Sequence, residues 1–217
     1  MRLIPADLEV VVIKLIEALE KAIGQVVTDF QSWPDRYWTE RDIHWNLLFN
    51  LRNNDIFEKA QAIELIRAEF PTINKYGKRR ARGHYDLVIL EPISFRDPNV
   101  LAFKPWAPLD DFLSRVKLLI AVEVKIWVDI LNTKEVLDML KWDIEKLTDQ
   151  DNRVQNPYLL NFVQLDFDKE IMKEYYYKLR EQLADQKKQW PTVKILCVPS
   201  NYRVQSQTSD NWVWFKE

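Results

Sequence analysis

The sequence has a single cysteine, Cys197, among its 217 residues. One cysteine excludes an internal disulfide, and no Cys/His cluster has the spacing of a zinc site. No apolar run approaches the roughly 18 residues that span a bilayer. The first 23 residues place charges such as Asp7 and Lys14 among apolar side chains, unlike a secretory signal. We therefore expect a cytoplasmic protein that does not enter membranes.

Charge of one sign is not in excess, since 31 Lys and Arg stand against 33 Asp and Glu. The net charge of -2 gives no support to a nucleic-acid partner, so any such support must come from local clusters. The sequence also lacks G-x-S-x-G, Walker and H-E-x-x-H motifs, which leaves other hydrolase or nucleotide-binding chemistry without support. A hydrophobic content of 47% indicates one globular domain over residues 1–217.

The apolar spacing predicts an α/β fold. Helices are expected at 6–24, 39–53, 133–149 and 168–189, with Gly24 ending the first and Thr39 capping the second. Strands are expected at 63–73, 84–91, 116–126, 158–165, 193–198 and, at an edge, 212–215. This order predicts a mixed central sheet with helices on both faces.

Three charged residues stand out within the predicted strands. Glu123 and Lys125 are two positions apart in the apolar strand 116–126, so they share one face of the sheet. Asp86 opens the apolar run of the preceding strand. Two neighbouring strands can therefore deliver one carboxylate each to a common point, an arrangement that suits a divalent metal.

Asp86 together with Glu123-Val124-Lys125 resembles the motif of the PD-(D/E)XK nuclease superfamily. The resemblance implies a restriction-endonuclease-like core of order αβββαβ. The core would cover residues 39–165, with a proline-rich insertion at 92–114, a helical extension at 1–38 and C-terminal additions at 166–217.

The resemblance also implies a role for each motif residue. Asp86 and Glu123 would hold Mg²⁺ or Mn²⁺, and the backbone carbonyl of Val124 would add a ligand. Lys125 would position the attacking water and offset charge on the phosphate. Glu40, in the first turn of helix 39–53, falls where the family often has a further acid that binds a second ion or orients the water. The alternative for Glu40 is that it only complements the helix dipole.

A basic run precedes Asp86, and its members are Lys75, Lys78, Arg79, Arg80 and Arg82. Its position beside the predicted metal site favours contact with nucleic-acid phosphates. The alternative is a solvated tip of the hairpin between strands 63–73 and 84–91.

Other polar residues are weaker candidates for the site. Glu69, on strand 63–73, could face it. On helix 133–149, Asp143 or Lys146 could contribute, although an ordinary i,i+3 ion pair explains both. His84 shares a strand face with Asp86, but no catalytic role is assigned to it.

These observations predict a metal-dependent nuclease that acts on DNA, with a homodimer as a plausible assembly. The alternative is a non-catalytic nucleic-acid-binding or assembly module that keeps the nuclease fold.

Overall fold

A mixed β-sheet forms the centre of the protein. A computed structural model describes residues 5–59, 63–76, 81–95, 109–127, 133–164, 170–200 and 213–215. The strands of the sheet, in spatial as well as chain order, are β1 (Ile66–Tyr76), β2 (Ala81–Leu90), β3 (Leu118–Trp127), β4 (Val154–Val163), β5 (Lys194–Pro199) and β6 (Val213–Phe215). β3, β4 and β5 are parallel, and the other neighbours are antiparallel. The predicted α/β fold with a mixed sheet is therefore confirmed.

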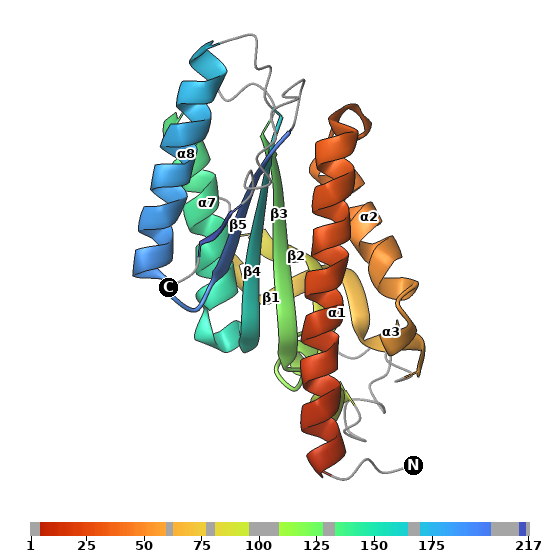
Figure 1. Ribbon diagram of the computed structural model, residues 1–217. Helices are drawn as coiled ribbons and strands as arrows, with labels where there is room; N and C mark the ends of the chain where they lie inside the picture. Colours follow the sequence, from red (N-terminus) through yellow and green to blue (C-terminus); the bar gives the residue numbers. More distant parts are fainter. Residues whose placement is uncertain are drawn as a thin grey trace.

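Helices cover both faces of the sheet (Figure 1). They are α1 (Pro5–Ser32), α2 (Glu40–Arg52), α3 (Asp55–Lys59), α4 (Pro92–Phe95), α6 (Leu109–Leu113), α7 (Thr133–Thr148) and α8 (Glu170–Gln189). α1 and α2 lie on one side, and α7 and α8 on the other. Polar contacts fix α1 to the sheet, because Glu20 Oε1 accepts from Tyr158 Oη at 3.0 Å and from Lys194 Nζ at 2.8 Å. None of the helices in the described ranges is long and apolar enough to cross a membrane.

The prediction that Gly24 ends the first helix is wrong. α1 continues for eight residues beyond it, to Ser32. Val26, Val27 and Phe30 keep the apolar helical period and are almost fully buried, so packing outweighs the weak helix propensity of a glycine.

β4 begins earlier than predicted, at Val154, and contains a proline in the interior of the sheet. Pro157 has no N–H to donate to a neighbouring strand. The adjacent side chain supplies a donor, since Asn156 Nδ2 bonds the Leu119 carbonyl of β3 at 2.9 Å. The strand therefore continues through Pro157.

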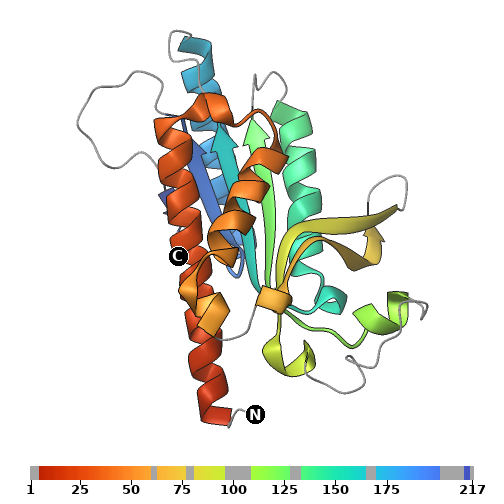
Figure 2. The same cartoon turned by 90° about the vertical axis from the view of Figure 1, so that its right-hand side faces the viewer.

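The proline-rich segment 92–114, predicted to be an insertion, contains the short helices α4 and α6. Residues 96–108 of this segment lie outside the described residues. The predicted turn at 74–83 is shorter than expected, because β1 extends to Tyr76 and β2 starts at Ala81. The resulting β1–β2 hairpin bends away from the other strands (Figure 2).

Replacement of Gly24 by alanine should stabilise the protein by about 1 kcal/mol, because alanine costs less to fix in a helix interior. A Cβ at this position meets no atom within 4 Å. Urea unfolding followed by circular dichroism measures the change. A matched control on the same helix, Phe30→Ala, should cost about 3–5 kcal/mol because Phe30 is fully buried. Equal or lower stability of Gly24→Ala would contradict this account of α1.

Candidate active site

The site begins where β2 and β3 separate. Their antiparallel ladder runs as far as the pair Leu87 and Val122, and the next residues along the two strands are Asp86 and Glu123. Beyond that point the Val124 N–H donates to the Asp86 side chain, with 2.6 Å between Val124 N and Asp86 Oδ2. A carboxylate therefore takes the place of a backbone acceptor and lies against β3.

Glu40 reaches the same region from the start of α2. Thr39 is the N-cap residue, as predicted, and its N–H donates to Asp42 Oδ2 at 2.8 Å. α2 is also tied to α1, because Asn46 Nδ2 donates to Asp29 Oδ2 at 3.1 Å. These contacts hold the first turn of α2 beside β3, where Glu40 Oε1 lies 3.4 Å from Lys125 Nζ.

Charged side chains of alternating sign link three elements of the fold. Lys125 on β3 lies between Glu40 and Asp143, with its Nζ 3.2 Å from Asp143 Oδ2. Lys146 Nζ lies 2.9 Å from Asp143 Oδ1 and 2.8 Å from Glu123 Oε1. We call the series Glu40, Lys125, Asp143, Lys146 and Glu123 the ion-pair chain. Through it, α7 is connected to β3 and β3 to α2.

Burial makes the ion-pair chain electrostatically demanding. Glu123 is only 1% exposed and Asp143 only 6%. Burial raises the pKa of Glu123 well above its usual range, and the neighbouring Asp143 and Asp86 carboxylates raise it further. Burial likewise raises the pKa of Asp86 and of Glu40, against the lowering effect of Lys125.

Burial acts on the pKa values of the two lysines in the opposite direction, but the neighbouring carboxylates outweigh it. Burial alone would lower the pKa of Lys125, but the surrounding carboxylates outweigh it and raise that pKa, with Asp143 and Glu40 contributing most. The pKa of Lys146 is raised in the same manner by Glu123 and Asp143. Both ammonium groups are therefore charged at neutral pH, so Lys125 is suited to electrostatic stabilisation rather than to accepting a proton.

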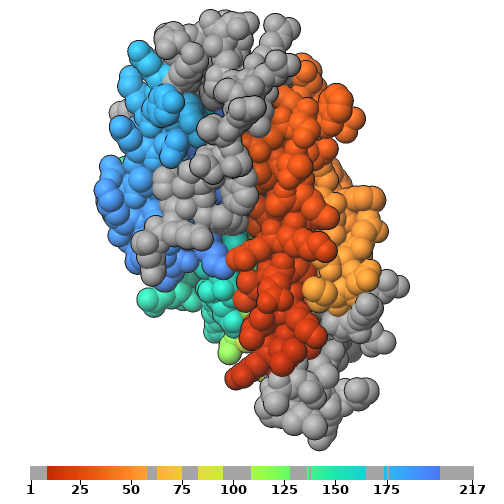
Figure 3. All heavy atoms as spheres, in the orientation of Figure 1, coloured from red at the N-terminus to blue at the C-terminus, as the bar shows by residue number. Residues whose placement is uncertain are grey.

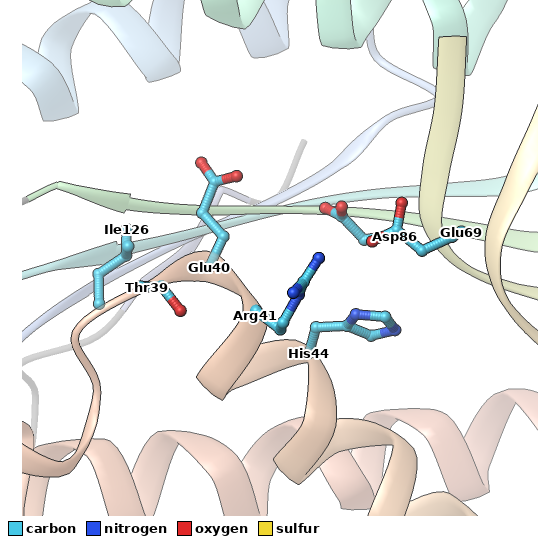
Figure 4. Close-up of a pocket in the computed structure, with 7 residues that line it drawn as sticks. All are labelled: Thr39, Glu40, Arg41, His44, Glu69, Asp86 and Ile126. Atoms are coloured by element: carbon cyan, nitrogen blue, oxygen red, sulfur yellow. The ribbon is translucent and has the colours of Figure 1, made fainter.

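A pocket of about 460 Å³ opens between α2 and the β1–β2 hairpin. Figure 4 shows Glu40, Arg41 and His44 of α2 together with Glu69 and Asp86 of the hairpin. Thr39 and Ile126 complete the lining. The pocket thus joins the Asp86 carboxylate to solvent, whereas Glu123 lies beneath the surface.

Two pocket residues are unusual, Glu69 in its backbone conformation and His44 in its burial. Glu69 has a φ of 49°, in the left-handed region that costs a non-glycine residue about 1 kcal/mol or more. It lies between the ladder positions Ala68 and Phe70, whose partners flank Asp86 on β2. His44 is 4% exposed, its Nε2 has no hydrogen-bond partner in the described part of the chain, and burial lowers its pKa. A neutral imidazole thus lines the pocket.

The donor chemistry of the site fits a hard divalent cation. Asp86, Glu123 and Glu40 offer carboxylate oxygens, the ligands that Mg²⁺ and Mn²⁺ take in proteins. Within the described ranges, no group of three or more His, Cys, Asp or Glu side chains is arranged as a ready metal site. In this structure the positive charge that balances the Glu123 carboxylate is the ammonium of Lys146.

The structure brings Asp86, Glu123, Lys125 and Glu40 together around the end of the β2–β3 ladder. Val124 is also in this cluster, and its carbonyl accepts from Lys125 Nζ at 3.3 Å.

Asp143 and Lys146 were only weaker candidates from the sequence, because an i,i+3 pair on a helix is normally solvated. In the structure they contact Lys125 and Glu123. Their one signal was proximity to the buried positions Leu140, Ile144 and Leu147 on the same helix. Arg41 and His44 were not predicted, although both are close to Glu40 in the sequence.

The basic run is only partly covered by the structure. Lys78, Arg79 and Arg80 lie outside the described residues. Lys75 and Arg82 pair across the β1–β2 ladder at the end of the hairpin. The phosphate-binding role of the run stays a prediction.

Asp86→Asn should stabilise the protein at neutral pH while keeping an acceptor for the Val124 N–H. A raised folded-state pKa means that the stability contributed by protonated Asp86 is lost as pH rises through that pKa. The gain should be on the order of 1 kcal/mol at pH 7–8, and it should vanish near pH 4. Denaturant titrations across this range measure it. Destabilisation by Asp86→Asn at pH 8 would contradict the conclusion that the charged form of Asp86 is unfavourable in the folded protein.

Lys146→Met should destabilise the protein by about 3–5 kcal/mol at pH 8, because it leaves the buried Glu123 without its counter-charge. The loss should shrink toward pH 5, since the raised pKa of Glu123 lets this side chain protonate. Urea midpoints at both pH values test this.

An exposed i,i+3 pair on α8 provides the control for Lys146→Met. Lys188 Nζ lies 3.0 Å from Asp185 Oδ1, and both side chains are mostly solvated. Lys188→Met should therefore change the free energy of unfolding by less than about 1 kcal/mol. A similar loss for the two lysine variants would refute the importance of burial.

Comparison with known proteins leaves the site itself as the basis for a function. No protein-family model, curated protein or solved structure matches this chain. A function is therefore inferred from the residues gathered around Asp86, Glu123 and Lys125.

Proposed function

We propose that the protein is a metal-dependent nuclease that hydrolyses phosphodiester bonds, with DNA as the expected substrate. The observation that carries the proposal is the hydrogen bond from the Val124 N–H to Asp86 where β2 leaves β3. This contact brings a carboxylate of β2 next to the Glu123-Val124-Lys125 segment, the combination that the PD-(D/E)XK resemblance requires.

The order of elements supports the same proposal. Apart from the short helices α3, α4 and α6, the elements from α2 to β4 follow the αβββαβ order of the restriction-endonuclease-like core. α1 and the later elements α8, β5 and β6 would be additions to that core. The fold assignment beyond a mixed α/β sheet belongs to this proposal.

Asp86, Glu123 and the Val124 carbonyl are the groups that would hold Mg²⁺ or Mn²⁺, with Glu40 as a further ligand. When bound, such an ion lowers the pKa of water and stabilises charge on a phosphate. A bound cation would also favour the charged forms of these carboxylates, whose pKa values are raised by burial and, for Glu123 and Glu40, also by neighbouring carboxylates.

Lys125 would act as a fixed positive charge. Its ammonium is held by Glu40 and Asp143 and stays protonated, so it can orient a water or a phosphate oxygen by hydrogen bonding. Asp143 and Lys146 act through other groups, because they set the positions of Lys125 and Glu123. The neutral His44 and the guanidinium of Arg41 would face the substrate in the pocket.

A second candidate function is a nucleic-acid-binding or assembly module without catalysis. The observation that favours it is the pairing of the buried Glu123 with Lys146, which gives this carboxylate a partner other than a metal. In this case the ion-pair chain would serve only to join α2, β3 and α7.

A cleavage assay tests the proposal. The protein should nick or degrade plasmid or single-stranded DNA in Mg²⁺ or Mn²⁺ and should be inactive with chelator. Glu123→Gln and Lys125→Met should each lower the initial rate by about 100-fold or more, because the first removes a charged metal ligand and the second removes the positive charge that orients the water or the phosphate. Asp185→Asn, on the exposed pair of α8, is the matched control and should cleave at the wild-type rate. Cleavage by the two site variants at the wild-type rate would overturn the assignment, whereas metal-independent DNA binding without any cleavage would favour the module.

A further inference from the structure

The most exposed residues of α2 are aromatic or basic, and the partly exposed Asp42 in the first turn is the acid beside them. Arg41, Trp45, Phe49 and Arg52 follow each other at intervals of three or four residues and are all exposed, so they form one stripe, which we call the α2 outer face. Trp45 is 56% exposed and Phe49 67%. α2 lies at the edge of the molecule in the space-filling view (Figure 3).

These two aromatic rings are not needed for the core. The opposite side of α2 already supplies the buried residues Ile43, Leu47, Leu48 and Leu51. An amphipathic helix normally presents polar residues to solvent, so adjacent exposed rings in the middle of its polar face indicate a binding surface.

The α2 outer face is continuous with the candidate active site. Arg41, at its first position, lines the pocket with Asp86 and Glu69. Trp45 stacks on the pocket residue His44, with 5.8 Å between ring centroids and 17° between ring planes. Trp38, 73% exposed, lies just before the helix. Thus one end of the stripe is at the pocket, and the stacked His44 holds the Trp45 ring in place.

The charge and shape of this face match single-stranded nucleic acid. Exposed rings stack on unpaired bases, and arginines beside the rings contact the phosphates. Trp45 and Phe49 are four positions apart on the helix, which corresponds to about 6 Å along its axis. A base stacked on each ring would therefore belong to one continuous strand. A duplex hides the faces of its bases, so the rings would find no partner on it.

We propose that the α2 outer face binds unpaired bases and directs a single strand into the pocket at Asp86. This inference rests on the proposed nuclease function, and it names the substrate class as single-stranded nucleic acid or single-stranded segments. The rings of Trp45 and Phe49 are the stacking residues, and Arg41 and Arg52 bind the flanking phosphates.

Fluorescence anisotropy tests the inference with a labelled strand of about 16 thymidines and a duplex of equal length, in EDTA so that no cleavage occurs. The wild-type protein should bind the single strand at least about tenfold more tightly than the duplex. Trp45→Ala and Phe49→Ala should each weaken single-strand binding by about tenfold. Arg41→Gln and Arg52→Gln should each reduce the slope of log affinity against log salt by about 1.

Trp190→Ala is the matched control, since Trp190 is 38% exposed next to the end of α8, on the other side of the sheet. It should bind as the wild type does. Single-strand binding that is unaffected by Trp45→Ala and Phe49→Ala would overturn the inference. The same conclusion would follow if sedimentation shows that the wild type is a dimer and that both variants are monomers with unchanged DNA binding, because the two rings would then form a dimer interface.

The binding and cleavage assays separate the two proposals. Binding that depends on Trp45 in a protein that never cleaves leaves the α2 outer face assigned and removes the nuclease activity. Cleavage with normal binding by the Trp45 variant removes only the present inference.

Discussion

The hydrogen bond between the Val124 N–H and the Asp86 carboxylate is the contact on which the site depends. It forms where β2 stops pairing with β3, so it substitutes a side chain for a ladder partner. The bend of the β1–β2 hairpin away from the sheet then leaves space for the pocket between the hairpin and α2. A fully paired β2–β3 ladder would close that space with backbone hydrogen bonds.

The buried charges of this site are unfavourable for the stability of the folded protein. The buried ion-pair chain joins α2, β3 and α7, but the burial of Glu123 raises its pKa and leaves its charged form unfavourable in the folded protein. Apolar residues of similar volume would pack at no such cost, and strongly perturbed carboxylates beside a pocket mark a candidate functional site. The left-handed backbone of Glu69 on the pocket wall adds to the same pattern.

The sequence allowed most of the sheet to be predicted, because apolar runs such as 116–126 are bounded by charged or turn residues. The ends of helices were harder to predict. Gly24 was wrongly taken as the end of α1, because buried side chains beyond it decide the length of this helix. The pair Asp86 and Glu123 could be foreseen from strand order. Asp143 was only a weaker candidate, because its contacts depend on how α7 is turned toward β3. Exposure of Trp45 is equally invisible to a pattern, since it requires knowing which face of α2 meets the sheet.

We propose that the end of the β2–β3 ladder, the buried charges around it and the α2 outer face form one site for phosphodiester hydrolysis. This proposal requires that Asp86 and Glu123 together bind a divalent cation. Calorimetric titration of the wild-type protein with Mn²⁺ tests this most directly, with Asp86→Asn titrated in parallel. We predict binding at millimolar or lower Mn²⁺ that Asp86→Asn abolishes or weakens by at least about tenfold, as expected when a charged ligand is lost. Absence of Mn²⁺ binding to the wild type, or equal binding to Asp86→Asn, would contradict it.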